Sequence, residues 1–387
     1  MDFDFSEDQT MIIDSARKFL EKECPKDRVR ELKEDEKGYD PEMWGKMVEM
    51  GWMGLILPEE YGGTGMEFFD LTILIEEMGR NILPGPFFQT VALCSLPVLE
   101  YGTPEQKRTI LPKIACGEEI WTLALTEPSA SYEPAAVELR ATSSQEQFIL
   151  EGTKLFVPYA NVADRLLVVA RTGQGENPRE GITVFIVDAK SPGIRTEVIP
   201  TTAHDKQCEV VFDGVKVPKD HVLGEMGKGW DIVEFILQRA SVLKSAEMLG
   251  GAQYVLEMAN SYAKERVQFD KPIGSFQAIQ HKLAGLLIGV EGLRRLVYEA
   301  AWHISADLPS RLLASMAKVK ANEVYQRTCV DAVKVHGAIG FTEELDLSLY
   351  FQRTKASEFA LGDSKFHRKR IAAELEGDQP LFLRSEP

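Results

Sequence analysis

The first part of the chain has apolar residues at helical spacing. They recur every three or four positions after an acidic start, beginning with Met11, Ile12, Ala16, Phe19 and Leu20. Ser6 and Gln9 precede them with the spacing of a capping box, in which each side chain bonds the other residue's backbone N–H. The pattern predicts an N-terminal helical domain over residues 1–118.

The pattern changes in the middle of the chain to short alternating or apolar runs. The runs are bounded by Gly, Pro, Asn and Asp, and they read IWTLAL, FILEGTKLFV, RLLVVAR, ITVFIVD and CEVVFDGVKV. Such runs predict a middle antiparallel β domain over residues 119–226. Helical periodicity then returns with few breakers, which predicts a C-terminal helical domain, a four-helix bundle, over residues 227–387. The expected fold class is therefore α+β.

Composition and charge exclude several classes of protein. A net charge of −16 over 387 residues argues against binding to nucleic acid or to an anionic membrane surface. The five cysteines are scattered and no histidine has metal-ligand spacing, so we expect neither a disulfide framework nor a metal site. No apolar run reaches membrane-spanning length, and the acidic start is unlike a signal or transit peptide. We therefore expect a cytoplasmic protein without membrane insertion.

The most informative segment is RVQFDKPIGSFQAIQHKLA, residues 266–284. The planar guanidinium of Arg266 suits a diphosphate, and Gln277 and Gln280 lie on one helical face as amide donors. The segment resembles the cofactor arm of the acyl-CoA dehydrogenase family, which reaches across a subunit boundary to hold the pyrophosphate and adenine of FAD. The resemblance implies that Arg266, Phe269, Phe276 and Gln277 bind FAD.

Further motifs extend this resemblance over essentially the whole chain. In order, they are PEEYGGTG at 58–65, ALTEP at 124–128, GTKLFV at 152–157, HGAIGF at 336–341 and LGDSKFHR at 361–368. Each alone is compatible with an ordinary tight turn, but a tight turn does not explain their shared order. The resemblance implies an acyl-CoA dehydrogenase fold, with Thr126, Phe156 and Gly337 also at the FAD site.

The resemblance also implies a reaction. The family takes a proton from Cα of an acyl-CoA thioester and passes a hydride from Cβ to flavin, giving α,β-desaturation. The weakly acidic α-proton requires a carboxylate base and a polarised thioester carbonyl. The implied partners are an acyl-CoA substrate, an electron-transferring flavoprotein, and either further copies of this chain or a paralogue in a tetramer.

The chain departs from the family at the catalytic base. Leu361 stands where most members have the catalytic glutamate, before Gly362. A branch of the family places the base on an earlier helix, where this chain has Ala240 or Gln238, depending on the alignment. None of these side chains is a carboxylate, so no catalytic residue is assigned.

Glu247 is the nearest carboxylate on that earlier helix. It shares a face with Ala240 but is displaced by roughly 10 Å along the axis. We expect it to be structural, paired with Lys244 or Gln280.

The flavin pocket departs from the family as well. Pro158 stands where the family has a hydroxyl residue, and it also lacks a backbone donor. Lys334 replaces a glutamine before the glycine loop, and its charge makes it a candidate phosphate partner.

Three functions remain open from the sequence. The chain is an acyl-CoA dehydrogenase with a relocated base, or it is a catalytically weak subunit that completes the FAD site of a paralogue in a heterotetramer. The less favoured third is a flavin monooxygenase or oxidase, which needs no α-proton base.

Overall fold

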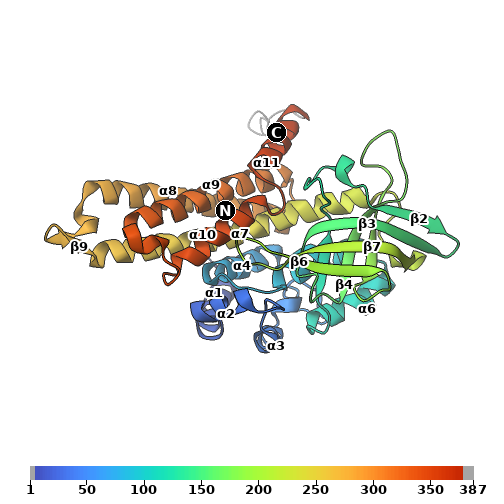
Figure 1. The fold of residues 1–387 in the computed structure, drawn as a ribbon, viewed down its shortest axis with the longest axis horizontal. Coiled ribbons are helices and arrows are strands. Elements are labelled where there is room, and N and C mark those ends of the chain that lie inside the picture. The colour runs from blue at the N-terminus through green and yellow to red at the C-terminus, as the bar shows by residue number, and fades with distance from the viewer. Residues whose placement is uncertain (1–4, 378–387) are drawn as a thin grey trace. The chain divides into compact units, whose positions relative to one another are not determined.

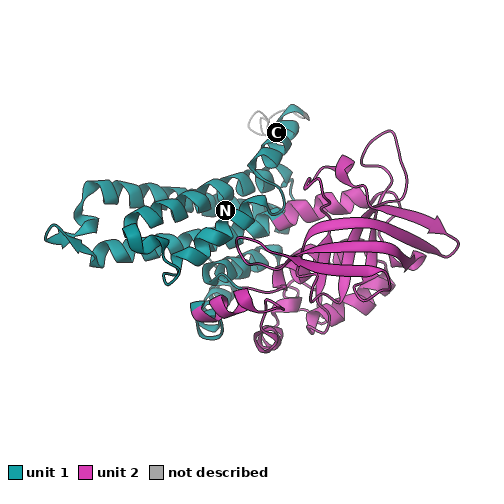
Figure 2. Ribbon diagram, in the orientation of Figure 1, with its two compact units in different colours: residues 1–26, 67–83, 241–387 teal, residues 27–66, 84–240 magenta. Residues whose placement is uncertain are grey.

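The computed structural model describes residues 5–377 as helices joined to one large sheet (Figure 1). Chain contacts divide it into two compact units (Figure 2). Unit 1 comprises Met1–Lys26, Glu67–Leu83 and Ser241–Pro387, and unit 2 comprises Asp27–Met66 and Pro84–Ala240. The long helix α7, Gly229–Glu265, contributes residues to both units.

Unit 1 is helical in its described part, apart from a short two-stranded hairpin over residues 267–272. Besides the second half of α7, its helices are α1 (Glu7–Glu23), α4 (Phe68–Asn81), α8 (Gln277–Ser305), α9 (Arg311–His336), α10 (Leu347–Phe359) and α11 (Ser364–Gly377). The predicted capping box of α1 is confirmed, since Ser6 and Gln9 bond each other's backbone N–H groups at 3.1 Å.

Two glycines let α4 and α7 cross closely. A Cβ at Gly79 would lie 1.9 Å from the carbonyl oxygen of Glu247, and one at Gly250 would lie 1.9 Å from that of Glu76. Any side chain at either position would force the helices apart. The crossing therefore fixes α4 against the part of α7 that belongs to unit 1.

Unit 2 is built around an eight-stranded sheet. Its helices are α2 (Lys26–Glu34, whose first residue belongs to unit 1), α3 (Pro41–Glu49), α5 (Leu96–Tyr101), α6 (Pro104–Ala115) and the start of α7. The strands are β1 (Trp121–Ala124), β2 (Arg140–Ser144), β3 (Gln147–Pro158), β4 (Arg165–Arg171), β5 (Ile182–Asp188), β6 (Ile194–Ile199), β7 (Gln207–Pro218) and β8 (Val222–Leu223). They run in the order β6-β7-β3-β2-β4-β5-β8, and β1 pairs with β4.

The helix–sheet–helix order expected from the sequence is confirmed. Most strand pairs are antiparallel, but β1 runs parallel to β4, and β2 meets β4 in parallel at Arg140 and Arg171. All five runs picked out in the sequence form strands. The pattern did not reveal β2, β6 and β8, because β2 and β6 are largely polar or exposed and β8 has only two residues.

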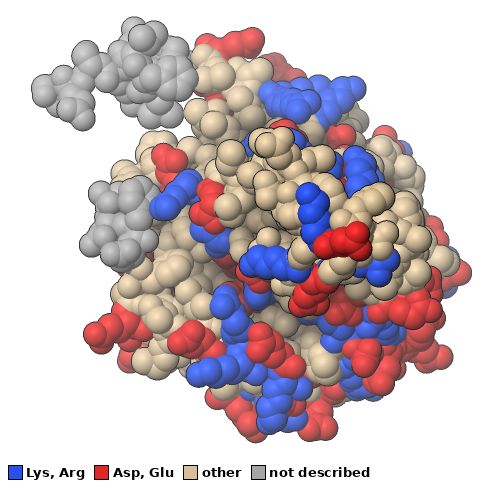
Figure 3. Space-filling view, turned by 90° about the vertical axis from the view of Figure 1, so that its left-hand side faces the viewer, with Lys and Arg blue, Asp and Glu red and all other residues tan. Residues whose placement is uncertain are grey.

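Charged side chains of both signs are distributed over the surface. On the face drawn in Figure 3, Lys and Arg side chains are interspersed with Asp and Glu rather than gathered in one basic patch. That face offers no broad basic surface to a phosphate backbone. Within residues 5–377, no helix is long and apolar enough to cross a membrane.

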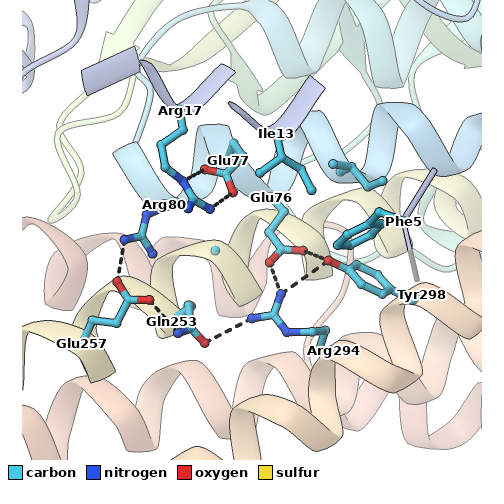
Figure 4. Close-up of a pocket in the computed structure, with 12 residues that line it drawn as sticks. Phe5, Ile13, Arg17, Glu76, Glu77, Arg80, Gln253, Glu257, Arg294 and Tyr298 are labelled. Carbon is cyan, nitrogen blue, oxygen red and sulfur yellow. Dashed lines mark hydrogen bonds and ion pairs between the residues drawn. The ribbon is translucent and has the colours of Figure 1, made fainter. Parts of the chain in front are cut away.

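A charged network lines a cavity of about 230 Å³ in unit 1 (Figure 4). Glu76 on α4 is ion-paired with Arg294 on α8 and accepts a hydrogen bond from the Tyr298 hydroxyl at 2.7 Å. Arg294 also donates to Gln253 on α7 at 3.1 Å. Burial raises the pKa of the Glu76 carboxyl, and Arg294 opposes that rise. The charges of Glu76 and Arg294 therefore depend on each other.

Replacing Arg294 with methionine should lower the free energy of unfolding by about 3–5 kcal/mol, because the buried carboxylate loses its cation. Chemical denaturation measures the change, with Arg295→Met, at the exposed neighbouring position, as the control. The double variant Arg294→Met/Glu76→Leu should recover most of the loss. A double variant as unstable as the single one would show that packing, rather than charge, holds α4 to α8.

Candidate active site

The arm predicted from the sequence is a short hairpin in unit 1. It follows α7 and consists of β9 (Val267–Gln268) and β10 (Lys271–Pro272). Phe269 and Asp270 form its tip, with φ values of 54° and 62°. Positive φ at both central residues is the geometry of a type I′ turn, which aromatic residues rarely adopt. The turn leaves the Phe269 side chain 87% exposed.

The other predicted arm residues lie beside this hairpin. Arg266 is exposed, and its backbone carbonyl accepts a hydrogen bond from Ile273 at 2.8 Å. Its guanidinium has no carboxylate partner within residues 5–377. The ring of Phe276 meets that of Phe269 edge-on at 6.1 Å, and Gln277 is exposed at the start of α8. The structure thus brings Arg266, Phe269, Phe276 and Gln277 together on one projecting segment.

The glycine loop at the end of α9 lies next to the base of the arm. Gly337 has φ 68° and ψ −137°, a conformation open to glycine, and a Cβ there would meet no atom within 4 Å. The preceding His336 is buried and stacks on Tyr262 of α7 at 4.4 Å. The backbone carbonyl of Tyr262 accepts the N–H of Arg266 at 2.9 Å, where α7 ends. The stacked rings therefore pack the end of α9, just before Gly337, against the last turn of α7.

Lys334 contributes positive charge near this loop. Its ammonium lies 3.0 Å from Asp331, and Lys282 of α8 reaches the same carboxylate oxygen at 3.1 Å. These two cations hold the pKa of the Asp331 carboxyl below its usual range, against the effect of burial. Two lysines on one aspartate leave a local excess of positive charge, as an anion site requires.

Thr126 and Phe156, the two predicted flavin-facing residues, belong to unit 2. The Thr126 hydroxyl donates to the carbonyl of Leu155 at 2.5 Å, and the Leu155 N–H returns a bond to the Thr126 carbonyl at 2.9 Å. Phe156 has φ 54° and its side chain is 47% exposed. The loop after β1 and the end of β3 are thus joined where the sequence places both motifs.

A buried ion pair that sequence reasoning missed supports this junction. Lys154 is fully buried and donates to Glu127 at 2.6 Å and to the carbonyl of Leu125 at 3.0 Å. Glu127 also accepts the backbone N–H of Leu139 at 3.1 Å. Burial lowers the pKa of Lys154 to about 8, although Glu127 favours the charged form. The alternation along β3 did contain the signal, because Phe148, Leu150 and Lys154 share the inward face.

The turn between α10 and α11 carries Leu361, the residue that the family resemblance assigns to the usual position of the base. Leu361 has φ 61° and is 7% exposed. Glu247, Glu234 and Glu358 are the candidates for a replacement base, and each already has a partner. Glu234 lies 3.3 Å from the indole nitrogen of Trp230 and 3.7 Å from Arg179. Glu247 lies 2.5 Å from Lys244, which confirms the pairing expected from the sequence, and Glu358 lies 3.1 Å from Lys355.

Another carboxylate at this turn has a structural bond. Asp363, two residues after Leu361, accepts the backbone N–H of Phe366 at 2.7 Å. In residues 5–377, no group of acidic, histidine or cysteine side chains is arranged to hold a metal ion.

His367 is the second feature that the sequence did not reveal. It is buried, and its Nε2 lies 3.0 Å from the carbonyl oxygen of Leu361. Burial, followed by the nearby Lys318, lowers the pKa of His367 to about 3. A neutral imidazole with its proton on Nε2 can donate to that carbonyl, so His367 ties the turn to α11.

These features fit FAD at the arm. A projecting guanidinium without a carboxylate partner suits the diphosphate, an exposed aromatic suits adenine, and the open backbone at Gly337 can approach a phosphate closely.

Comparison with known proteins agrees with this fold. Models of the acyl-CoA dehydrogenase N-terminal, middle and C-terminal domains match residues 6–118, 122–215 and 227–376. The chain is 31% identical to the probable acyl-CoA dehydrogenase YngJ of Bacillus subtilis, covering 97% of this chain and all of that one.

Two further relatives are named as parts of complexes. One, 31% identical, is a subunit of the caffeyl-CoA reductase–Etf complex of Acetobacterium woodii, with 96% of this chain and 99% of that one covered. The other is a chain in the crystal structure of the ChsE4-ChsE5 complex from Mycobacterium tuberculosis, with a TM-score of 0.90, 29% identity, and coverage of 98% and 100%. The chain therefore belongs to the acyl-CoA dehydrogenase family of FAD-dependent oxidoreductases.

Replacing Arg266 with alanine should weaken FAD binding by about ten- to a hundredfold, because a diphosphate loses a charged partner. Flavin retention on gel filtration and fluorescence titration of the apoprotein measure the change. Lys264→Ala removes an exposed charge two residues away and should leave the affinity unchanged. Equal retention by Arg266→Ala and Lys264→Ala would remove Arg266 from the site.

His367 should make the fold sensitive to acid. Its pKa is lower in the folded chain than in the unfolded one, so the unfolded state binds more protons between pH 6.5 and about 3. Its contribution to stability is complete above pH 6.5 and is lost as the pH falls, by a few kcal/mol in all. His367→Gln should flatten this limb of the stability profile, whereas His281→Gln, at an exposed position, should not. Parallel profiles for wild type and His367→Gln would contradict the assignment.

Proposed function

We propose that this chain is one subunit of a heteromeric acyl-CoA dehydrogenase, in which it supplies a cofactor arm to a paralogous chain that carries the catalytic base. The observation that carries the proposal is Leu361. A hydrocarbon side chain cannot accept the α-proton of a thioester, and the nearby carboxylates Glu247, Glu358 and Asp363 are each already engaged.

The arm has the features that such a role requires. Arg266 and Phe269 project from unit 1 as an exposed cation and an exposed aromatic. We propose that Arg266 holds the FAD pyrophosphate, with Lys334 and Gly337 beside it, and that Phe269 lies near the adenine. Phe276 and Gln277 complete this end. Bound FAD supplies the acceptor for the hydride that leaves Cβ.

We further propose that Thr126 and Phe156 face the flavin ring from unit 2. Phe156 has an exposed side chain on a constrained backbone, and Thr126 fixes the backbone of the adjacent residue. Pro158, by contrast, offers neither a hydroxyl nor an N–H, so this chain's own flavin pocket has fewer donors. This chain therefore has the residues of the cofactor arm but fewer hydrogen-bond donors in its flavin pocket. That combination favours an assembly in which one chain supplies the arm and another supplies the catalytic base.

The partners follow from the same proposal. The substrate is an acyl-CoA thioester that undergoes α,β-desaturation, and electrons leave to an electron-transferring flavoprotein. The Acetobacterium relative is named as a subunit of an Etf complex, and the Mycobacterium tuberculosis structure is that of the ChsE4-ChsE5 complex. We propose a tetramer, because an arm that serves a neighbour needs that neighbour in a fixed position.

The chain expressed alone and loaded with FAD should bleach its flavin slowly with short, long, branched and aromatic acyl-CoA thioesters. Leu361→Glu should accelerate bleaching by about 10²–10⁴-fold, because it restores a positioned base. Leu361→Gln, which has the same size but no basic oxygen, is the matched control. Stopped-flow absorbance of the flavin measures all three.

Rapid bleaching of the wild-type chain at full FAD occupancy would reject the subunit proposal and leave a homomeric enzyme with another base. Alanine substitutions at Glu247, Glu234 and Glu358 would then locate that base.

A further inference from the structure

A polar stripe runs along the buried side of α9. Ser315, Lys318 and Asn322 follow each other at intervals of three and four residues, so they lie on one helical face. All three are buried, and Lys318 has no exposed surface. A buried cation is costly unless acceptors surround it, so the groups around Lys318 indicate what it does.

Lys318 contacts only acceptors. Its ammonium nitrogen lies 2.7 Å from Asn322 Oδ1 and 2.9 Å from the carbonyl oxygen of Ser357. The carbonyl oxygens of Glu358 and Gly362 lie at 3.2 and 3.3 Å. Two of these carbonyls belong to the last turn of α10, where the helix leaves them without intrahelical donors, and the third follows Leu361 directly. One side chain therefore binds the turn before and after Leu361.

The two other members of the stripe hold the far side of the same turn. Asn322 donates through Nδ2 to the hydroxyl of Ser364, the first residue of α11, at 3.1 Å. The Ser315 hydroxyl lies 3.4 Å from Nδ1 of His367, whose other ring nitrogen contacts the Leu361 carbonyl. Residues of the polar stripe thus contact the turn both where α10 ends and where α11 begins. His367 contacts the Leu361 carbonyl between these two points.

The contacts require Lys318 to be a cation. An ammonium has three protons to donate, whereas a neutral amine would direct a lone pair at an oxygen. Burial, followed by Lys244, lowers the pKa of Lys318 to about 7, and Glu358, Asp363 and Glu247 oppose the shift.

The charged neighbours of Lys318 come from every element packed around it. Lys244 and Glu247 lie on α7, Glu358 on α10, and Asp363 precedes α11. On α11, His367 faces Lys318 and is neutral at physiological pH, because its pKa is about 3.

We propose that Lys318, as a cation bonded to Asn322, is the positioning residue that keeps the turn around Leu361 in the shape that binds the acyl-CoA thioester. This inference rests on the proposed function, since it takes that turn as part of the acyl-CoA site. It goes further by assigning the turn's shape to one buried charge, independently of the side chain at position 361.

The test measures binding rather than turnover. The probes are acetoacetyl-CoA and 3-oxopalmitoyl-CoA, whose β-carbons are carbonyls and carry no hydride to transfer. The FAD-loaded assembly is titrated by calorimetry as wild type, Lys318→Met and Lys320→Met. Lys320 is two residues away on α9 and partly exposed, in an ion pair with Glu323, so it controls for removing a charge from this helix.

Lys318→Met should raise the Kd for the probes by about ten- to a hundredfold at pH 6.5 while FAD content stays unchanged. Lys320→Met should bind like wild type. Equal Kd values for Lys318→Met and wild type would overturn the inference while leaving the proposed function intact. Failure of the wild-type assembly to bind either probe would overturn both.

A pH series on the wild type tests the same point without any variant that has to fold. Between pH 6 and 9 the probes should bind progressively more weakly as Lys318 loses its proton. Stability should change in the opposite direction, because the pKa of Lys318 is lower in the folded chain, and the unfolded state binds more protons above pH 7. If Lys318 only stabilised the fold, its loss of a proton with rising pH would raise stability without weakening the binding of the probes. Probe affinity that does not fall across this range would contradict the proposal.

Discussion

The organisation of this molecule depends on the constraint that a buried positive charge must be surrounded by acceptors. Three buried or half-buried cations satisfy it, and each does so by joining segments distant in sequence. Arg294 joins α8 to α4 and α7, Lys154 joins β3 to the loop after β1, and Lys318 joins α9 to the turn after α10. Apolar contacts tolerate small shifts, but a cation with three or four defined acceptors fixes distances. The candidate functional segments are held by the second and third of these cations.

Three residues with positive φ lie in the candidate functional segments. Phe156, Phe269 and Leu361 each have φ near +55° to +60°, a conformation unfavourable for side chains of their size. Such conformations persist where the surroundings determine them strongly. At Leu361 those surroundings are His367 and Lys318, and at Phe156 they are the bonds between Thr126 and Leu155. These bonds fix the backbone around Leu361 and Phe156 whatever chemical group the side chain carries.

Much of the fold could be predicted because its signals are local. The capping box at Ser6 and the apolar runs of β3, β4 and β5 depend on neighbouring residues, and they formed as expected. The edge strand β6 was missed because its exposed residues do not alternate. The arm was recognisable as a contiguous segment. The roles of Lys154 and Lys318 were not, because all their partners except Asn322 lie 27 to 44 residues away and only the fold brings them together. A lysine at an inward position of a strand or helix is the one local sign of such a role.

The lowered pKa of Lys318 indicates that this lysine fixes the shape of the turn rather than stabilising the fold. A pKa near 7 in the folded chain means that folding disfavours the charged form of this lysine. An apolar side chain of similar volume would avoid that penalty, and replacing buried charges in this way is often neutral or stabilising. Lys318 is therefore poorly explained as a device for stability. What it supplies is a set of fixed carbonyl positions on both sides of Leu361, and that geometry is independent of whether residue 361 can accept a proton.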